Sequence, residues 1–376
     1  MPRILIVTGE ASGDLHGANL AASIRSLRPD AEILGVGGAK LKAAGVSLLQ
    51  GIEHLDAIGM VGVGQLRAAI SKYLTICRFL RSNSLDAVVL IDNPGLNLRL
   101  ARAAKRLGHR VVYYIAPQIW AWNPGRIRLI RRDVDRMIVV LPFEETLYRQ
   151  AGVPCDFVGH PLLDAVAPSY DRDELRKRFG HDGTGPLLGL LPGSREQEVH
   201  ALLPTMLQAA EALRDAHPGL KLVIAQAASI QDRLIQDLVR QGDHDIRIAR
   251  DQSSEVMAAA DLLFVASGTA TLQAAVIGTP MIILYKLSWL SYWLGRMLIR
   301  INCIGLVNIV AGDKFVPELI QGDASPARLR DEGHRLLSDA QSSTRMRARL
   351  RTVRESLGQP GASQRAAAVV LAECKS

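Results

Sequence analysis

Several features that would place this 376-residue chain in a simple class are missing from its sequence. Its four cysteines form no C-x-x-C pair, so neither a zinc site nor a disulfide framework is indicated, and a reducing cytoplasm fits best. No apolar run reaches the roughly 18–20 residues that a membrane-spanning helix needs. The apolar run Ile4–Thr8 is too short for a signal peptide. The sequence therefore predicts a cytoplasmic protein that can meet a membrane only at its surface.

A dinucleotide-binding fingerprint is absent as well. The glycine-rich stretch Gly9–Gly17 follows an apolar run, but it lacks the G-x-G-x-x-G spacing. No acidic residue ends the next apolar run, Ile33–Gly37, where one would bind the cofactor's ribose. These omissions disfavour a nicotinamide cofactor.

The sequence does contain an excess of positively charged residues. It contains 45 Lys and Arg against 37 Asp and Glu, a formal net charge of +8. This excess favours an anionic partner, which the charge alone leaves open among nucleic acid, a phosphorylated substrate and an anionic lipid surface. The hydrophobic fraction of 48% is that of a globular protein, and the length exceeds the usual limit of one hydrophobic core. We therefore expect two domains.

Short apolar runs alternate with helical patterns in both halves of the chain. Strands that alternate with helices indicate parallel sheets built from βαβ units, so the predicted fold class is α/β with two Rossmann-like domains. Glycines and prolines between residues 165 and 185 mark the expected hinge. Ligands of such sheets bind beyond the carboxyl ends of the strands. The predicted strands are Ile4–Thr8, Ile33–Gly37, Ala87–Ile91, Val111–Ile115, Arg136–Val140, Leu187–Leu191, Leu220–Ala225, Ile246–Ala249, Leu262–Ala266 and Met281–Tyr285.

The stretch Leu187–Val199 is a candidate anion site. A buried strand leads through Gly193, Ser194 and Arg195 into a helix, which offers backbone N–H groups and a guanidinium to a phosphate. The same pattern also occurs in ordinary strand-to-helix connections.

A second turn of this kind follows the strand that ends at Ala266. Gly268 and Thr269 stand at the start of the next helix, where they could bind phosphate or simply cap the helix. Further along, Asn308 lies in an apolar context and needs a hydrogen-bond partner. Glu318 is expected to begin a helix.

Polar residues also follow the predicted strands of the first half. Asp92 comes directly after an apolar strand, where it is either a general base or a turn residue that accepts nearby N–H groups. Asn97 either binds a substrate hydroxyl or caps the following helix. Glu10 and Ser12 either cap the first helix or bind a sugar hydroxyl.

Taken in order, the motifs of this chain resemble those of the lipid-A-disaccharide synthases, a family of inverting glycosyltransferases with the GT-B fold. The resemblance runs from end to end, and the order of the motifs makes it more specific than any one of them. The motifs are GEASGD at Gly9–Asp14, IDNPGLN at Ile91–Asn97, YIAPQIWAWNPGR at Tyr114–Arg126, LPFE at Leu141–Glu144, FVGHP at Phe157–Pro161, LPGSR at Leu191–Arg195, ASGTATL at Ala266–Leu272, and NIVAG with PELIQ at Asn308–Gln321.

The resemblance implies two domains that face one cleft. Residues 1–168 would form an acceptor and membrane side, with the helices of about residues 352–376 packing back on it, and residues 169–351 would bind the donor. The implied reaction transfers 2,3-diacylglucosamine from UDP-2,3-diacylglucosamine to 2,3-diacylglucosamine 1-phosphate, forming the β-1,6 disaccharide and UDP without metal or cofactor. It also implies attachment to the anionic inner face of the inner membrane and no nucleic-acid partner. It leaves open whether the chain forms a homodimer.

The resemblance assigns roles to the candidate residues. Asp92 would be the general base, and the leaving diphosphate would contact Arg195, the Gly193–Ser194 backbone and the Gly268–Thr269 turn. The acceptor or reaction side would include Glu10 and Ser12, and the uridine-sugar side Asn308 and Glu318. Asn97 and Gln273 are further substrate-binding candidates, with Gln273 at a possible ribose contact.

Two residues depart from the family pattern. Gly95 replaces a second carboxylate after Asp92, and Gln273 replaces a common Glu, which leaves any ribose contact neutral. Because of these losses, two alternatives stay open at this point: another GT-B enzyme acting on a UDP-N-acetylglucosamine substrate, and a non-catalytic lipid- or nucleotide-binding module.

Overall fold

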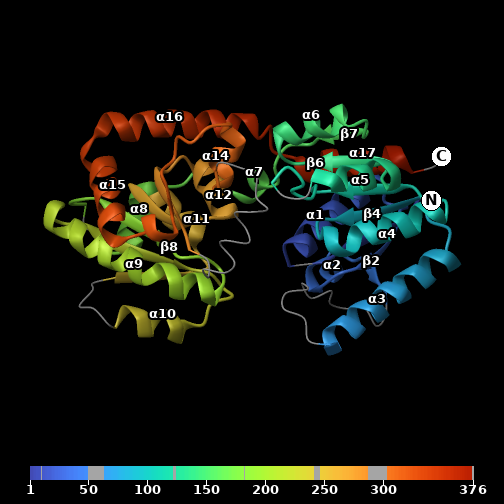
Figure 1. Ribbon diagram of the computed structural model, residues 1–376, viewed down its shortest axis with the longest axis horizontal. Helices are drawn as coiled ribbons and strands as arrows, with labels where there is room; N and C mark the ends of the chain where they lie inside the picture. The colour runs from blue at the N-terminus through green and yellow to red at the C-terminus, as the bar shows by residue number, and fades with distance from the viewer. Residues whose placement is uncertain are drawn as a thin grey trace. The chain divides into compact units, whose positions relative to one another are not determined.

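The computed structural model describes residues 1–9, 11–49, 63–121, 124–181, 183–240, 246–286 and 303–374 (Figure 1). The chain divides into two compact units. The first comprises Met1–Asp164 with Leu357–Ser376, and the second comprises Ala165–Ser356. Among the described residues, no helix combines the length and the apolarity that crossing a membrane requires.

The first unit is built on a parallel sheet of strand order β3-β2-β1-β4-β5-β6-β7. Its central strand β4 (Ala87–Ile91) is buried at every position, as expected for a strand covered by helices on both faces. The other strands are β1 (Arg3–Thr8), β2 (Glu32–Val36), β3 (Ser47–Leu48), β5 (Val111–Tyr114), β6 (Arg136–Val139) and β7 (Cys155–Phe157).

Helices follow most strands of this sheet, and the C-terminal helix α17 (Ala362–Glu373) packs against α1 (Ala11–Leu27) (Figure 1). The remaining helices are α2 (Ala39–Ala43), α3 (Val63–Ser82), α4 (Pro94–Arg106), η1 (Pro124–Arg126), α5 (Ile127–Asp133), α6 (Pro142–Gln150) and α7 (Leu162–Ala165).

The second unit repeats the scheme with the strand order β10-β9-β8-β11-β12-β13, again parallel. Its strands are β8 (Leu187–Leu191), β9 (Lys221–Gln226), β10 (Ile246–Arg250), β11 (Leu262–Ala266), β12 (Met281–Tyr285) and β13 (Glu318–Ile320). The expectation that Glu318 begins a helix is therefore wrong. Pairing with β12 at the sheet edge holds this three-residue segment extended, and nothing local in its sequence shows that pairing.

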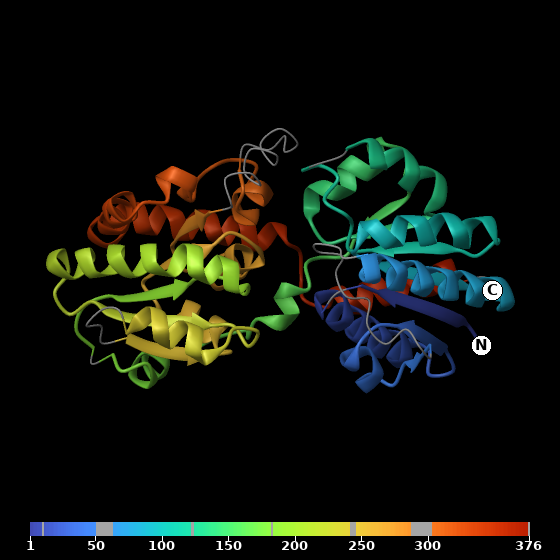
Figure 2. The ribbon, with the colours of Figure 1, turned by 60° about the horizontal axis from the view of Figure 1, so that its bottom comes forward.

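The helices of the second unit cover both faces of its sheet. On one face α9 (Glu196–Ala216) and α15 (Pro326–Ser338) lie side by side (Figure 2). Gly333 of α15 makes this close contact possible, because a Cβ there would press on Leu213 and Phe264. The others are α8 (Arg172–Arg178), α10 (Asp232–Val239), α11 (Ser253–Ala259), α12 (Thr269–Ile277), α14 (Leu306–Ala311), η2 (Gln321–Asp323) and α16 (Ala340–Ser356).

Candidate functional site

A cavity of about 340 Å³ lies at the carboxyl ends of β8, β9 and β11 in the second unit. The chain runs from β8 to β9 on one side and places β11 on the other, so the cavity sits at the switch point of the sheet, where such folds bind ligands. Six of the residues predicted from sequence line it together: Gly193, Ser194, Arg195, Gly268, Thr269 and Gln273.

The turn before α9 is closed by a carboxylate from its own helix. Glu198 Oε2 accepts the backbone N–H groups of Ser194 (3.1 Å) and Arg195 (3.3 Å), and Oε1 lies 3.1 Å from Arg195 Nη1. Gly193 has a φ of 114°, and a Cβ there would collide with the Glu198 carboxylate. Glu198 therefore occupies the position that the sequence suggests for a phosphate.

The turn before α12 is different. No side chain caps this helix, and the N–H groups of Gly268, Thr269 and Ala270 have no acceptor among the described residues. Thr271 turns inward instead, donating its hydroxyl to the Gly268 carbonyl at 2.8 Å. The start of α12 thus presents unsatisfied donors to the cavity, together with the positive end of the helix dipole.

Gln273 and Ser267 connect the cavity wall to neighbouring elements. Gln273 Nε2 donates to Ser254 Oγ at 2.7 Å, which joins α12 to α11. Ser267 Oγ donates to the Ile304 carbonyl at 3.1 Å. Both contacts fix the direction in which the α12 turn faces.

Asn308 and Glu318 do not line this cavity but form a buried pair behind it. Asn308 Nδ2 donates to Glu318 Oε1 at 2.9 Å, and Glu318 in turn accepts the N–H groups of Ile304 and Gly305. Because Ile304 also accepts from Ser267, the pair acts on the cavity through the 304–305 loop.

Sequence reasoning missed Glu198 as part of the cavity wall, together with Gln226 and Asp251. A glutamate three residues after the N-cap residue, here Arg195, is a signal for a capping contact, and it could have identified Glu198. Gln226 carried no such signal, since its position depends on contacts with Ile230 and Asp232 formed on folding.

In the first unit, Asp92 follows β4 at the switch point between β1 and β4. Asp92 and Asn93 have φ values of 50° and 40°, a left-handed conformation that is costly for two successive non-glycine residues. Gly9, the first residue after β1, lies so close to Asn93 that a Cβ would collide with it. Strain of this kind is typical of functional sites.

The Asp92 turn is held by its neighbours. Tyr113 donates its hydroxyl to the Asp92 carbonyl at 2.5 Å, and Asn97 Nδ2 donates to the carbonyls of Asp92 (2.8 Å) and Ile91 (2.9 Å). Asn97 is buried, so in this structure it fixes the turn and does not point a free amide group outward. The residue Asp92 as a whole is half-buried.

Ser12 is exposed in the first turn of α1, and Glu10 lies outside the described residues. In the same motif Asp14 is buried and accepts the N–H groups of Gly38 and Lys40, so it holds the turn after β2. No local pattern in the sequence indicates that contact.

The turn before α6 in the first unit is also capped by a carboxylate. Glu144 accepts the indole N–H of Trp120 at 3.0 Å and the backbone N–H of Leu141 at 3.3 Å. Only 1% of Glu144 is exposed, and this burial raises the pKa of its carboxyl group to about 7.

Comparison with known proteins gives a consistent picture. The model of a family described as lipid-A-disaccharide synthetase matches residues 4–372. The lipid-A-disaccharide synthases of Geobacter metallireducens and Syntrophus aciditrophicus are 44% and 45% identical to this chain over 370 residues. Both matches cover 98% of this chain, and they cover 96% and 97% of the two relatives, respectively.

Solved structures are similar in fold at low identity. A UDP-GlcNAc 2-epimerase from Neisseria meningitidis, solved with UDP-GlcNAc, has a TM-score of 0.65 at 12% identity and covers 98% of this chain and 100% of its own. MurG of Acinetobacter baumannii has a TM-score of 0.60 at 14% identity, with coverage of 99% and 100%. These likenesses confirm the predicted fold class of two Rossmann-like domains of the GT-B type.

Proposed function

Because the chain belongs to the lipid-A-disaccharide synthase family, we propose that it transfers 2,3-diacylglucosamine from its UDP derivative to 2,3-diacylglucosamine 1-phosphate. The products are the β-1,6-linked disaccharide and UDP. Family membership rests on the match over residues 4–372 and on relatives of 44% identity. The alternative of a UDP-N-acetylglucosamine enzyme rests on structures of 12–14% identity, which bear on the fold alone.

The observation that carries the donor assignment is the open start of α12 in the cavity of the second unit. A departing UDP gathers negative charge on its diphosphate, and fixed N–H donors and a guanidinium stabilise such charge. The donors are those of Gly268, Thr269 and Ala270, and the guanidinium is that of Arg195, whose side chain is 81% exposed. Gln273 lines the same cavity and is assigned to the nucleoside part.

Asp92 is the proposed general base. It takes the proton from the 6-hydroxyl of the acceptor while that oxygen bonds to the anomeric carbon of the donor from the face opposite UDP. The electrons of the broken bond leave with UDP, and the anomeric configuration inverts. Asn97 positions the Asp92 turn through its two carbonyl contacts.

The remaining candidates have supporting roles. Ser12 and Glu10 are assigned to the acceptor side of the reaction. Asn308 and Glu318 are assigned to the donor side, where their contacts support a positioning role through the 304–305 loop. A homodimer stays a prediction.

We also propose peripheral attachment to the anionic inner face of the inner membrane. Both substrates are anionic lipids, and the formal charge of +8 favours approach to such a surface.

The test is an assay of UDP release and disaccharide formation with the acylated donor and acceptor, repeated with UDP-N-acetylglucosamine as donor. We expect turnover only with the acylated donor. The variant Asp92→Asn should lose about a hundredfold to ten-thousandfold in kcat with an unchanged melting temperature, as expected for removal of a general base. Asp30→Asn, an exposed carboxylate of the same unit, is the control.

Two results would count against these assignments. Equal turnover with both donors would favour the alternative enzyme. Parallel losses of melting temperature and activity in Asp92→Asn would make Asp92 a structural turn residue.

A further inference from the structure

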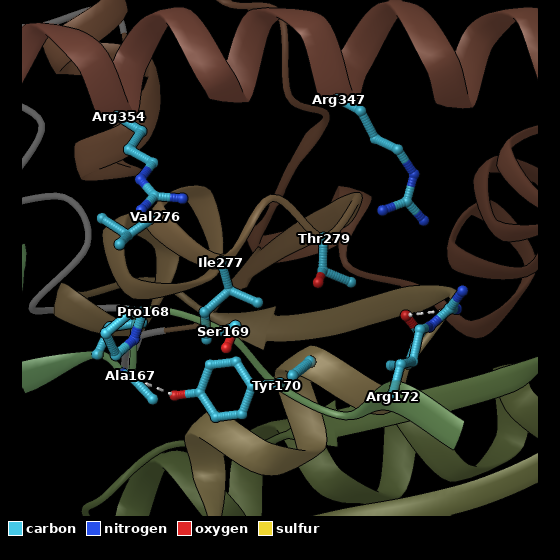
Figure 3. Close-up of a pocket in the computed structure, with 13 residues that line it drawn as sticks. Ala167, Pro168, Ser169, Tyr170, Arg172, Val276, Ile277, Thr279, Arg347 and Arg354 are labelled. Atoms are coloured by element: carbon cyan, nitrogen blue, oxygen red, sulfur yellow. Dashed lines mark hydrogen bonds between the residues drawn. The ribbon is translucent and has the colours of Figure 1, made fainter. Parts of the chain in front are cut away.

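A second cavity of the same unit, about 250 Å³ in volume, has no residue in common with the donor cavity. It lies at the other ends of the same helices. The starts of α11 and α12 reach the donor cavity, whereas their C-terminal residues, among them Ala258 and Ile277, line this second one. The segment Val166–Tyr170 and helix α16 complete its wall (Figure 3).

Three arginines line this cavity, and no carboxylate does. Arg347 and Arg354 are seven residues apart on α16, which is two helical turns, and Figure 3 shows both side chains directed from α16 toward the cavity. Arg172 enters from the opposite wall. The nearest carboxylate partner, Asp261, lies outside the lining and is already shared between Arg172, Arg176 and the N–H of Leu187.

Part of this positive charge serves the fold. Arg172 donates to the carbonyls of Ala259 and Ala260, and Arg347 donates to those of Gly278 and Asp261, so both cover the carbonyl ends of helices. That role does not account for all of the donors. Arg347 is half-buried, has five N–H groups and forms no ion pair in the part of the chain that the structure describes, although the charge of Asp261 attracts it. Burial, and after it the charge of Arg172, lowers the pKa of its guanidinium. Arg354 has no hydrogen bond or ion pair among the described residues.

The rest of the wall fits a polar group of limited size. Tyr170 accepts the Ala167 N–H at 3.3 Å, which leaves its own hydroxyl hydrogen to donate. Pro168, Val276 and Ile277 add apolar surface beside the arginines. The volume is well above the roughly 30 Å³ of a water molecule.

We propose that this cavity binds a phosphate group and that Arg354 is its main contact. Arginine is well suited to this task because its planar fork contacts two phosphate oxygens at once. The site is separate from the donor cavity, and the proposal does not rest on the proposed transferase reaction. Its ligand is either a free phosphate compound or the phosphate of a lipid headgroup.

The test measures binding of pyrophosphate by calorimetry to the full chain with UDP at saturation, so that the donor cavity is filled. Arg354→Ala should weaken binding about tenfold, the loss of one charge-assisted contact. Arg351→Ala, an exposed arginine of the same helix outside the lining, should change it less than about twofold and serves as the matched control. The Arg354 side chain is exposed and forms no hydrogen bond or ion pair within the described part of the chain, so its removal should leave the melting temperature nearly unchanged.

A second arm distinguishes the two sources. Flotation with phosphatidylglycerol vesicles, and with phosphatidylcholine vesicles as the neutral control, is repeated for both variants. If Arg354→Ala alone reduces binding to the anionic vesicles, the ligand is a lipid headgroup; if only pyrophosphate binding falls, it is a free phosphate compound. Equal effects of the two variants in both arms, or no pyrophosphate binding beside UDP, would overturn the proposal.

Discussion

Two strand-to-helix turns line the donor cavity, and they offer their backbone donors in opposite ways. Before α9, Glu198 satisfies the N–H groups of Ser194 and Arg195. Before α12, no side chain caps the helix. The difference teaches that a helix start attracts an anion only when its own side chains have not already occupied its donors.

The α9 turn still has a way to contribute. The Arg195 side chain is 81% exposed, although that of its partner Glu198 is only 27% exposed. Pairs with such solvent access contribute only about 0–1 kcal/mol, so Arg195 can exchange its partner for a phosphate at little cost. We therefore infer that the diphosphate contacts the backbone at α12 and the side chain of Arg195 at α9.

The largest change in UDP affinity is expected when one backbone N–H is removed from the α12 turn. Thr269→Pro does so at the first helical residue, where proline fits the helix. A hydrogen bond to a charged group contributes about 1.5–3 kcal/mol, so UDP should bind about tenfold to a hundredfold more weakly by calorimetry. Thr269→Ala keeps the N–H and should stay within about threefold.

A proline at the start of α9 tests whether the backbone of this second turn contributes to UDP binding. Glu196→Pro removes the first helical N–H of α9 after a residue whose extended backbone accepts a following proline. Relative to Glu196→Gln, it should change UDP affinity less than about twofold. If the two proline variants weaken UDP binding equally, the two turns are equivalent and the comparison fails.

A smaller effect of opposite sign is expected at Glu198. Glu198→Gln removes the negative charge beside Arg195 but keeps an oxygen that accepts the backbone N–H groups. Because exposed pairs contribute up to about 1 kcal/mol, UDP should bind about twofold to fivefold more tightly, with a slightly lower melting temperature. Glu196→Gln on the same helix is the charge-matched control, and weaker UDP binding by Glu198→Gln would show that the carboxylate supports the site.

Features that depend on neighbouring residues could be predicted from the sequence, whereas features that depend on pairing between separate segments could not. The strand Leu187–Leu191 was predicted with the bounds that β8 has, because a strand buried on both faces is a continuous apolar run. The edge strand at Glu318 was missed, since its pairing with β12 leaves no periodic pattern.

The site divides in the same way. Local turn chemistry indicated Gly193–Arg195 and Gly268–Thr269, which do line one cavity. Contacts between distant segments were not readable, among them the hold of Asp14 on the turn after β2 and the link from Glu318 through Ile304 to Ser267. The spacing of Glu198 from Arg195 was readable, but the sequence alone did not show that the carboxylate points into the cavity.

A substitution of Glu144 should leave UDP affinity unchanged, which is the smallest effect of the series. Glu144 caps α6 as Glu198 caps α9, but it is buried. Burial raises its carboxyl pKa from 4.5 to about 7, so the folded chain holds a proton that the unfolded chain has lost. The free energy of unfolding should therefore fall as pH rises from about 4.5 through about 7.

Thermal unfolding across that range should show a flatter slope in Glu144→Gln, which cannot ionise, and a lower melting temperature because one of two accepting oxygens is lost. Glu145→Gln, a half-exposed neighbour paired with Arg149, should keep the slope of the unaltered protein. An unchanged slope in Glu144→Gln would mean that this carboxylate is hydrated, like Glu198. The contrast between the two caps would then lie in their partners, Trp120 and Arg195, and not in their burial.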